Sequence, residues 1–289
     1  MAEIGRVIKF YNSFFFVKVG DEIIPCKLRG LLKRDKKIGS AVYVGDFVEI
    51  SRLKDKSGVI ERVQSRRNIL IRPSIANVDR VILTFAVDAP KLHPLLLNRF
   101  LVLAEKSTLA EIIICINKID LMSKENFLSE YEPLYKILRT STIKGTGIDE
   151  LKKILASGVT VFAGPSGVGK SSLLNAVDKS LKLKVGKVSE KILRGKHTTR
   201  ISELIEFGGG FLVDTPGFSA VDLTEAGLDK KNLWHCFKEF APFAASCKFL
   251  NGCSHSHEPD CGVKSAVERG EILRERYESY LTLLEEVNI

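Results

Sequence analysis

The chain has 289 residues, of which 45% are hydrophobic, as expected of a soluble globular protein with two or three domains. No apolar run approaches roughly 18 residues, and the start Met-Ala-Glu-Ile lacks the pattern of a secretory signal. These features favour a cytoplasmic protein without a membrane partner.

Positive charge is concentrated toward the amino terminus. The formal net charge is +9, and residues 1–72, with 16 Lys or Arg and 8 Asp or Glu, account for +8 of it. Such a concentration favours a polyanion partner through counterion release and electrostatic steering. A basic surface that is merely solvated is the alternative explanation.

Five short apolar stretches separated by turn residues predict five strands in the same segment. They are Ile4–Phe10, Phe14–Val19, Glu22–Leu28, Asp46–Ser51 and Gly58–Val63. Five strands within roughly 65 residues suit a small OB-type barrel, residues 1–68, a fold that binds nucleic acid. We expect core burial for the rings around the first turn, although an exposed ring could stack on a base. These rings belong to Phe10, Tyr11, Phe14, Phe15 and Phe16.

An unpatterned polar stretch around Pro73 predicts a linker, residues 69–76, that leads into an α/β domain, residues 77–229. Val78–Val87 has the pattern of a buried strand, and the helices predicted after it include Leu95–Lys106 and Ser123–Arg139. Apolar strands that alternate with helices imply a mainly parallel sheet covered on both faces.

Asn117-Lys118-Ile119-Asp120 follows the apolar strand Ile112–Ile116 and has the N-K-x-D pattern of a guanine-binding loop. Asp120 would accept hydrogen bonds from the N1–H and amine of guanine, whereas adenine would leave this carboxylate unpaired. Asn117 would tie the loops together, and the aliphatic stem of Lys118 would cover the base. Alone the motif is weak, because it also suits a helix cap. The weakest signal is Ser141-Thr142, which stands where GTPases place a small-residue loop against the guanine O6.

A phosphate-binding loop follows the apolar strand Val159–Ala163 and precedes a predicted helix that starts at Ser171 and Ser172. Its glycines let backbone N–H groups converge on phosphate oxygens above the positive end of the helix dipole. Lys170 would hold the β and γ phosphates, and Ser171 would ligate Mg²⁺. The loop consists of Gly164, Pro165, Ser166, Gly167, Val168, Gly169, Lys170 and Ser171. A Gly-rich turn without a ligand is the bland alternative.

Two further segments have the composition of GTPase switches. Phe211–Gly217 is a strand that ends in D-x-x-G, in which Asp214 would hold a Mg²⁺-bound water and the Gly217 N–H would contact the γ-phosphate. The polar segment Arg194–Arg200 lies before it and contains Thr198 and Thr199, both candidates for the second Mg²⁺ ligand from protein. Spacing does not choose between them, and Thr199 is taken as the working assignment.

The position after D-x-x-G, where Ras-like enzymes carry a water-orienting Gln, is Phe218 in this chain. A phenyl ring can neither donate nor accept the required hydrogen bonds, so intrinsic hydrolysis should be slow or served by another residue. His197 is the nearest substitute, and we hypothesise that it positions water once a partner orders the segment. An exposed His that contacts phosphate or RNA is the alternative.

Cysteine spacing defines the carboxy-terminal part, residues 230–289. Three thiolates and one imidazole in Cys247-x5-Cys253-x-His255-x5-Cys261 form a set that suits a structural Zn²⁺ with no open position for catalysis. His257 competes for the fourth position, and His255 is preferred. Helices are predicted on both sides of the cluster, at Asn232–Phe240 and Ser265–Val287.

The order of these motifs is unusual, because N-K-I-D precedes the phosphate loop, whereas the usual GTPase chain carries the phosphate loop first. With its basic five-stranded start, its G-K-H-T-T and D-T-P-G-F segments and its Cys/His cluster, the chain resembles the circularly permuted ribosome-assembly GTPases of the YjeQ/RsgA family. The resemblance covers nearly the whole chain. It departs at one point, since five residues separate Cys247 from Cys253 where the family has four.

The resemblance implies a bacterial GTPase that binds the small (30S) ribosomal subunit and its 16S rRNA late in maturation, with low activity alone and stimulation by that subunit. It also implies GTP or GDP with Mg²⁺ at the nucleotide loops and one zinc ion at the cluster. A monomer is the default expectation. Two rivals are a metabolic or signalling NTPase and a zinc-bearing RNA-binding scaffold with a vestigial nucleotide site.

Overall fold

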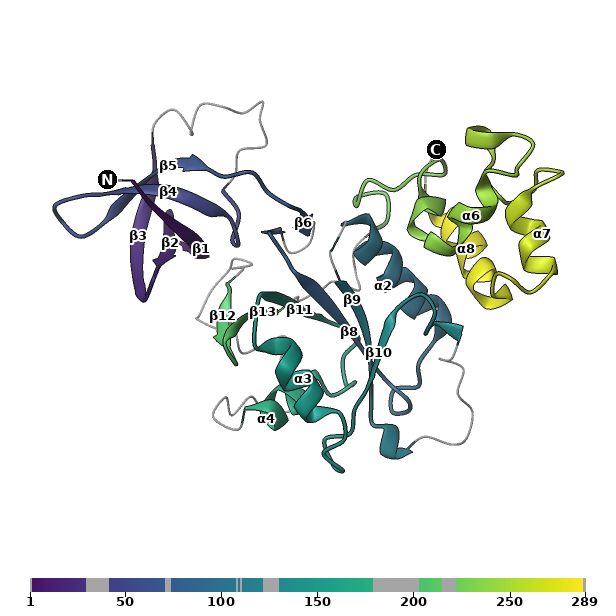
Figure 1. Ribbon diagram of the computed structural model, residues 1–289, viewed down its shortest axis with the longest axis horizontal. Helices are drawn as coiled ribbons and strands as arrows, with labels where there is room; N and C mark the ends of the chain where they lie inside the picture. Colours follow the sequence, from purple (N-terminus) through teal and green to yellow (C-terminus); the bar gives the residue numbers. More distant parts are fainter. Residues whose placement is uncertain are drawn as a thin grey trace.

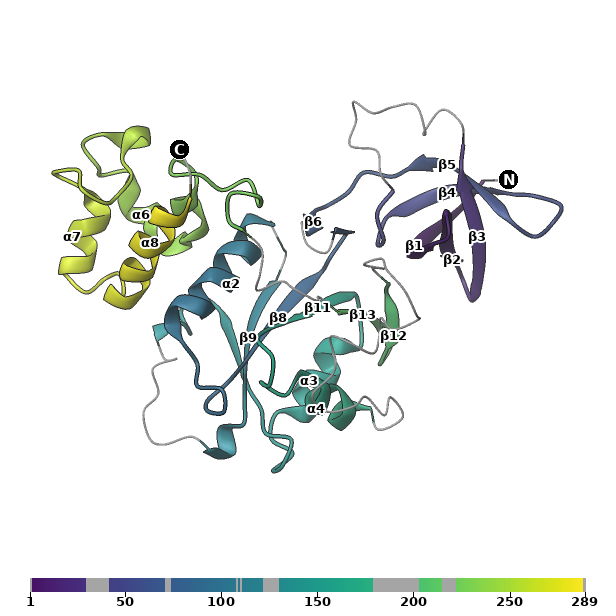
Figure 2. The same cartoon turned by 180° about the vertical axis from the view of Figure 1, so that it is seen from behind.

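The computed structural model describes residues 2–29, 42–70, 74–107, 109, 111–121, 130–178, 203–214 and 222–287. A β-barrel, a central sheet with helices on both faces and a carboxy-terminal helical part follow one another along the chain (Figure 1). The barrel and the helical part lie on opposite sides of the central sheet domain, as the view from behind also shows (Figure 2).

The amino-terminal strands close into a barrel in the order β1-β2-β3-β5-β4, which confirms the predicted five-stranded architecture. Alternate side chains point inward, as strand geometry requires, and the barrel core includes Val7, Val17 and Ile50, which are fully buried. The strands are β1 (Glu3–Tyr11), β2 (Phe14–Val19), β3 (Glu22–Leu28), β4 (Phe47–Arg52) and β5 (Gly58–Val63).

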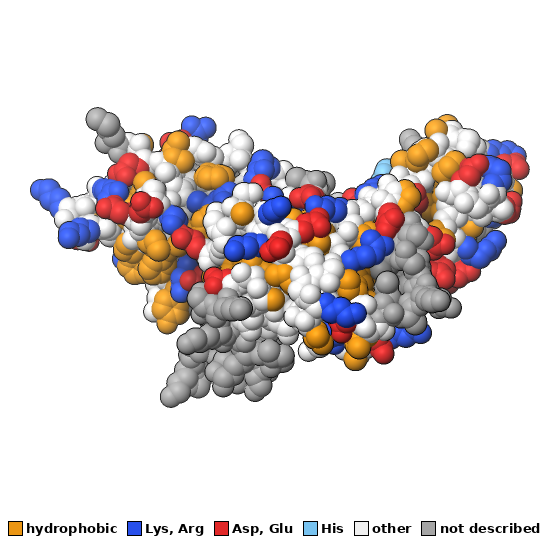
Figure 3. All heavy atoms as spheres, turned by 60° about the horizontal axis from the view of Figure 1, so that its bottom comes forward, with side chains coloured by type: hydrophobic (Ala, Val, Ile, Leu, Met, Phe, Trp, Pro, Cys, Tyr) orange, Lys and Arg blue, Asp and Glu red, His pale blue; other side chains and the backbone are white. Residues whose placement is uncertain are grey.

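The aromatic residues around the first turn differ in how far they are buried. Phe15 is buried as expected, and Phe14 and Phe16 are half-buried. Phe10 and Tyr11, at the end of β1, are 45% and 46% exposed, so the expectation of core burial is wrong for these two rings. They are the last two residues of β1 and pair with Phe15 and Phe14 of β2, but their own side chains remain accessible to water. Hydrophobic side chains gather on the barrel in the space-filling view (Figure 3).

The segment predicted as a linker is packed against the barrel. Its ends form two short antiparallel strands, β6 (Ile69–Leu70) and β7 (Ile75–Ala76), and Leu70 and Ile75 are buried. Ile75 also pairs with Val44 of the barrel. Gly45 has φ of +94°, and a side chain there would overlap the Ala76 carbonyl oxygen, so only glycine allows this close approach.

The central sheet has the order β10-β9-β8-β11-β13-β12, and every neighbouring pair is parallel except β12 and β13. A mainly parallel sheet is therefore confirmed. Its strands are β8 (Arg80–Ala86), β9 (Glu111–Asn117), β10 (Lys136–Arg139), β11 (Val159–Ala163), β12 (Ile205–Phe207) and β13 (Gly210–Asp214).

Helices cover the sheet on both faces. On one face α3 (Ile148–Leu155) and α4 (Lys170–Val177) bury Leu151 and Leu173 against Ile82 and Ile113 of the sheet. On the other face α2 (Pro94–Lys106) buries Phe100, whose ring meets that of Phe85 edge-on at 5.4 Å. Both faces of β8 and β9 are thus inaccessible to water, which explains their nearly continuous apolar sequences.

The predicted helix Ser123–Arg139 is wrong over its second half. Residues 122–129 lie outside the described part of the chain, Tyr131–Tyr135 form turns, and Lys136–Arg139 is strand β10, parallel to β9. Ile137 and Leu138 satisfy a helical pattern as readily as a strand pattern, because four residues are too few for their periodicity to decide. Pairing with the free edge of β9 decides instead.

The carboxy-terminal part is helical, but its helices are shorter than predicted. Asn232–Phe240 contains two 3₁₀ turns, η5 (Leu233–Cys236) and η6 (Lys238–Phe240), and Ser265–Val287 is divided between α7 (Gly262–Glu268) and α8 (Arg274–Glu286). Gly270, with φ of +75°, ends α7 in the left-handed conformation that favours glycine. Between η6 and α7 lie the short helix α6 (Ala241–Ala244) and the turn η7 (Leu250–Gly252).

Helix α8 packs on α2 through a buried polar network. The Arg276 side chain is 1% exposed; its guanidinium donates to Glu239 at 2.6 and 2.9 Å and to the Asn98 amide oxygen at 2.9 Å. The Asn98 amide nitrogen in turn donates to Ser279 at 2.8 Å. These contacts fix the helical part to the central domain. None of the helices in the described part of the chain has the length and apolar composition that crossing a bilayer requires.

Candidate nucleotide site and metal centre

Three sequence motifs follow the carboxyl ends of neighbouring parallel strands. The phosphate loop comes after β11, N-K-I-D begins at the last residue of β9, and Ser141 comes shortly after β10. Because β10, β9, β8 and β11 are adjacent in this order and run parallel, all three loops lie at the same edge of the sheet, at the bottom of Figure 1. This edge is where open α/β sheets bind their ligands.

The phosphate loop has the backbone that its sequence predicts. Gly164, Gly167 and Gly169 all have positive φ, and a side chain at Gly164 would overlap the Thr84 carbonyl oxygen of β8. Helix α4 begins directly after Gly169. The Lys170 amine donates to the carbonyl oxygens of Gly164 at 2.7 Å and Pro165 at 2.8 Å, so it folds over the loop. Ser171 is buried at the start of the helix, while Ser166 and Gly167 are exposed.

Asn117 joins the phosphate loop to the base loop. Its amide nitrogen donates to the Val168 carbonyl at 2.9 Å, and its amide oxygen accepts from the Thr140 hydroxyl at 3.1 Å. A side chain at Gly169 would overlap the same amide nitrogen. Two segments 51 residues apart in the sequence are therefore held in a single arrangement.

Lys118 makes a second connection between the loops. Its amine donates to the Gly167 carbonyl at 2.9 Å and to the Ala89 carbonyl. Ala89 lies in the connection between β8 and α2, so this connection is a third neighbour of the phosphate loop. The Lys118 backbone has φ of +60°, which turns the chain sharply after β9.

The Asp120 carboxylate is held by the loop that was the weakest sequence signal. Ser141 is buried, and its hydroxyl donates to Asp120 at 2.5 Å while it accepts from the Lys144 N–H at 3.1 Å. This arrangement fixes one carboxylate oxygen and the rotation of the carboxylate about its last bond. Thr142, next in the chain, is half-buried.

Several predicted site residues fall outside the described part of the chain. They are His197, Thr198, Thr199 and Gly217. Asp214 is the last residue of β13, next to Phe162 of β11, so its backbone lies one strand away from the phosphate loop.

Sequence reasoning missed Thr140 and Ala89. Thr140 directly precedes the predicted Ser141-Thr142 pair, and its position at the end of an edge strand was hidden by the wrong helix prediction. Ala89 contributes only a backbone carbonyl, which no side-chain pattern reports. The signal that could have found it is topological, because the segment after β8 must emerge beside the phosphate loop.

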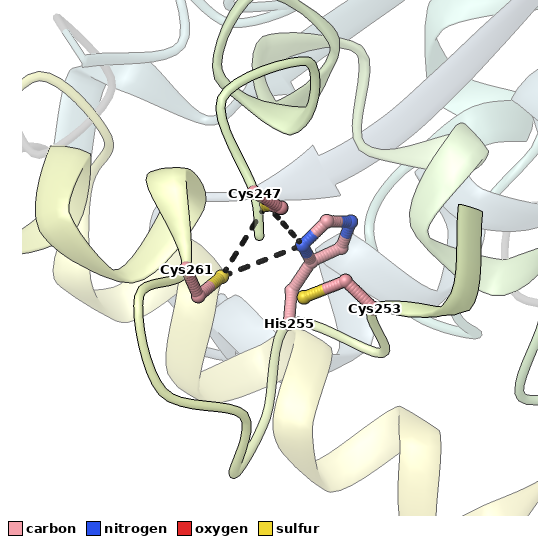
Figure 4. A group of neighbouring side chains, drawn as sticks. All are labelled: Cys247, Cys253, His255 and Cys261. Carbon is pink, nitrogen blue, oxygen red and sulfur yellow. Dashed lines mark hydrogen bonds between the residues drawn. The ribbon is translucent and has the colours of Figure 1, made fainter. Parts of the chain in front are cut away.

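The four predicted metal ligands lie together in the carboxy-terminal part (Figure 4). The His255 Nδ1 atom is 3.5 Å from the sulfurs of both Cys247 and Cys261, and these sulfurs are 3.8 Å apart. With Zn–S near 2.3 Å and Zn–N near 2.0–2.1 Å, a tetrahedral site has S···S edges of about 3.8 Å and S···N edges of about 3.5 Å. The donor set and these spacings therefore fit zinc.

The cluster is shielded from water, and the imidazole points its Nδ1 atom toward the sulfurs. All four side chains are buried, and the rings of Trp234 and Phe240 meet the His255 ring nearly edge-on. Burial raises the pKa of the Cys253 thiol to about 12 and lowers the pKa of His255. A metal must therefore displace thiol protons to bind, so the affinity for the metal should decrease as the pH is lowered. His257 is exposed, and its ring nitrogen contacts the Ser256 hydroxyl.

The longer spacing between the first two cysteines is accommodated by tight turns. The Leu250 N–H donates to the Cys247 carbonyl at 3.1 Å, and the Cys253 N–H donates to the Leu250 carbonyl at 3.0 Å. Glu258 fastens the following loop by accepting hydrogen bonds from Ser254 and Ser256. Partial burial acts to raise the pKa of Glu258, but these hydrogen bonds lower it to about 2.

Two family models match the chain, the RsgA N-terminal domain over residues 4–60 and the RsgA GTPase over residues 63–224. A protein of Caldanaerobacter subterraneus subsp. tengcongensis named "Small ribosomal subunit biogenesis GTPase RsgA" is 42% identical over 288 residues, covering 98% of this chain and 95% of that protein. The chain belongs to the RsgA GTPase family. An identically named relative from Clostridium botulinum is 43% identical, with 98% of this chain and 96% of the relative covered.

Solved structures agree with this RsgA family assignment. YjeQ from Thermotoga maritima superposes with a TM-score of 0.83 at 40% identity, over 99% of both chains. YloQ, described as a circularly permuted GTPase, gives a TM-score of 0.80 at 34% identity, over 99% of this chain and 95% of that one. This RsgA family member is a GTPase, a hydrolase that acts on GTP, and the permuted order predicted from its motifs is confirmed.

Proposed function

We propose that the protein hydrolyses GTP at the loops around Asn117 and assists the biogenesis of the small ribosomal subunit. The observation that carries this proposal is the Asn117–Val168 hydrogen bond, which joins a guanine motif and a phosphate loop that occur in inverted order. The curated relatives that carry the subunit-biogenesis name span nearly the whole chain, so the proposal applies to all three parts.

Each loop of the nucleotide site would contact a different part of GTP. Asp120, oriented by Ser141, would accept from the guanine N1–H and amine, and Thr142 would stand near the base. Backbone N–H groups of residues 164–172 and the Lys170 amine would hold the phosphates, with the amine exchanging its present carbonyl partners for phosphate oxygens.

For hydrolysis, water would attack the γ-phosphorus and the bond to the β–γ bridging oxygen would break, giving GDP and inorganic phosphate. Mg²⁺ would neutralise phosphate charge as it develops, and its proposed holders are Ser171, Asp214 and Thr199 or Thr198. The Gly217 N–H would contact the γ-phosphate. His197 would orient the attacking water, in place of the Gln that the chain lacks at Phe218.

The barrel would contact the RNA of the small (30S) subunit, its 16S rRNA. Its excess positive charge and the exposed rings of Phe10 and Tyr11 suit a nucleic acid surface. We place the working domain limits at 1–68, 69–76, 77–229 and 230–289, with Cys247, Cys253, His255 and Cys261 holding one structural Zn²⁺. The protein would work as a cytoplasmic monomer.

GTP turnover with and without purified small subunits tests the proposal, beside ATP and Lys170→Ala controls. We expect slow basal GTP hydrolysis, marked stimulation by subunits, and neither with ATP or with the variant. Equal turnover of ATP and GTP would refute the guanine assignment. Unchanged assistance of subunit maturation by a Lys170→Ala protein would instead support the RNA-binding scaffold.

A further inference from the structure

On the side away from β2, strand β1 of the barrel is bordered by two different parts of the chain. It pairs with β4 only over Glu3–Arg6. Beyond that point residues of the central domain continue along the same strand: the Leu204 N–H donates to the Ile8 carbonyl at 2.8 Å, and Lys9 and Glu203 form an antiparallel bridge. The barrel edge is thus completed by the residues that lead into β12 (Figure 1).

Ion pairs reinforce this contact between the two domains. The Lys9 amine lies 3.0 Å from the Glu203 carboxylate, with both side chains about one-third exposed, and Lys18 of β2 pairs with Glu206 of β12. A third contact comes from Arg6, whose guanidinium lies 4.4 Å from the Phe47 ring of the barrel and 5.7 Å from the Phe211 ring of β13. The barrel therefore holds both strands of the β12–β13 hairpin.

This hairpin lies between the two segments proposed as switches. Glu203 follows Arg200 by three residues, and β12 pairs with β13 through Ile205 and Leu212 before β13 ends at Asp214. A paired hairpin moves as a unit, because shifting one strand breaks its ladder or carries the partner along. A displacement of β1 would therefore be transmitted to Glu203, which follows one proposed switch segment, and to Asp214, which begins the other.

We infer that Lys9 and Glu203 are positioning residues, through which the barrel sets the β12–β13 hairpin and so couples RNA binding to GTP hydrolysis. The inference rests on the proposed function for its biological meaning, but the physical coupling can be measured without ribosomal subunits. Neither residue touches the nucleotide loops described above, so loss of the pair should spare basal turnover.

A charge-swap cycle tests the role of the pair in stimulation. Lys9→Glu and Glu203→Lys should each lower the ratio of subunit-stimulated to basal turnover by about 2–5-fold, the range expected for a partly exposed ion pair, and the double swap should restore it. Glu203→Lys is the decisive single variant, because it removes no cation from the barrel and should leave subunit affinity undiminished. Glu61→Lys, which breaks the exposed Arg29–Glu61 pair between two residues of the barrel domain, is the matched control and should behave as wild type.

Amide hydrogen exchange of Leu204 gives a readout that needs no subunits. Its protection should differ between the GDP and GTP-analogue forms of the wild type and should fall in Glu203→Lys, with recovery in the double swap. Identical exchange in both nucleotide forms, or protection unaffected by the swap, would overturn the inference. If wild-type turnover is not stimulated by subunits, the proposed function fails, and the exchange measurement still decides the coupling.

Discussion

Asn117 connects the loops of the candidate nucleotide site through two buried hydrogen bonds. One amide reaches the phosphate loop through Val168 and the Ser141 loop through its neighbour Thr140. Both of its hydrogen-bonding ends are buried and matched, so any loss leaves an unpaired polar group in the interior. At the scale of residues, the site depends on a few such matched polar contacts.

Asp120→Asn should abolish the preference for guanine. The amide would present an N–H donor where the carboxylate offers two acceptors, at a cost of about 1–3 kcal/mol per mismatched group, or roughly 10–100-fold in affinity. Calorimetry with GDP and ADP measures the change. Ser141→Ala, which removes only the hydrogen bond that orients the carboxylate, should lose less. An Asp120→Asn protein with wild-type base preference would contradict the assignment of the motif.

Gly169→Ala should weaken guanine nucleotide binding by at least about tenfold, because the methyl group would overlap the Asn117 amide and separate the two loops. The matched control is Gly270→Ala. Gly270 also has positive φ, but nothing lies near the position of its added methyl group. The control therefore has a similar backbone strain and should keep wild-type nucleotide affinity. Equal losses in both variants would show that strain, and not the overlap, is responsible.

At the scale of elements, the contact of α2 with α8 depends on a buried charge. Arg276→Ala should destabilise the protein by about 3–5 kcal/mol, since Glu239 and Asn98 would lose a buried partner. Arg269→Ala removes an exposed pair with Glu271 and should leave the free energy of unfolding nearly unchanged. Denaturant unfolding of both variants measures the difference. Similar losses in the two variants would show that breaking the buried network around Arg276 costs no more stability than breaking an exposed ion pair.

Most elements could be predicted because their sequences satisfy one pattern only. Val159–Ala163 is apolar except for Thr160 and is followed directly by the glycine of a phosphate loop, and its strand has the predicted bounds. Lys136–Arg139 could not be assigned, because pairing with β9, more than twenty residues away, decides its conformation. The Asp120 side chain, which hydrogen-bonds Ser141, was singled out by a motif, whereas the backbone contact of Ala89 was not.

At the scale of the whole molecule, the order of the three parts followed from the sequence but their contacts did not. Lys9 and Glu203 are 194 residues apart, and each alone resembles an ordinary solvated charge. Arg276 and Asn98 are 178 residues apart, and the residues around each one likewise do not indicate that the two meet. Local patterns do not encode which distant surfaces meet.

Removing the proposed zinc ion should loosen the carboxy-terminal part while sparing the nucleotide site. Structural zinc contributes folding energy directly, and α7 follows the proposed ligand Cys261 without a break. Trp234 is the single Trp of the chain, and its ring centre lies 5.2 Å from that of His255. Chelation should therefore change Trp fluorescence, and added Zn²⁺ should restore it, with GDP affinity within about threefold of its starting value. If elemental analysis shows that zinc has been lost and the Trp emission is unchanged, the prediction is refuted.

The barrel meets the sheet at the edge where β11 and β13 begin, whereas the guanine and phosphate loops occupy the edge where β9 and β11 end. A strand of five residues spans roughly 17 Å, so this width of protein separates the two surfaces. A nucleotide bound at these loops would therefore lie about one strand length away from the barrel. Any influence of one on the other would have to pass through the strands between them.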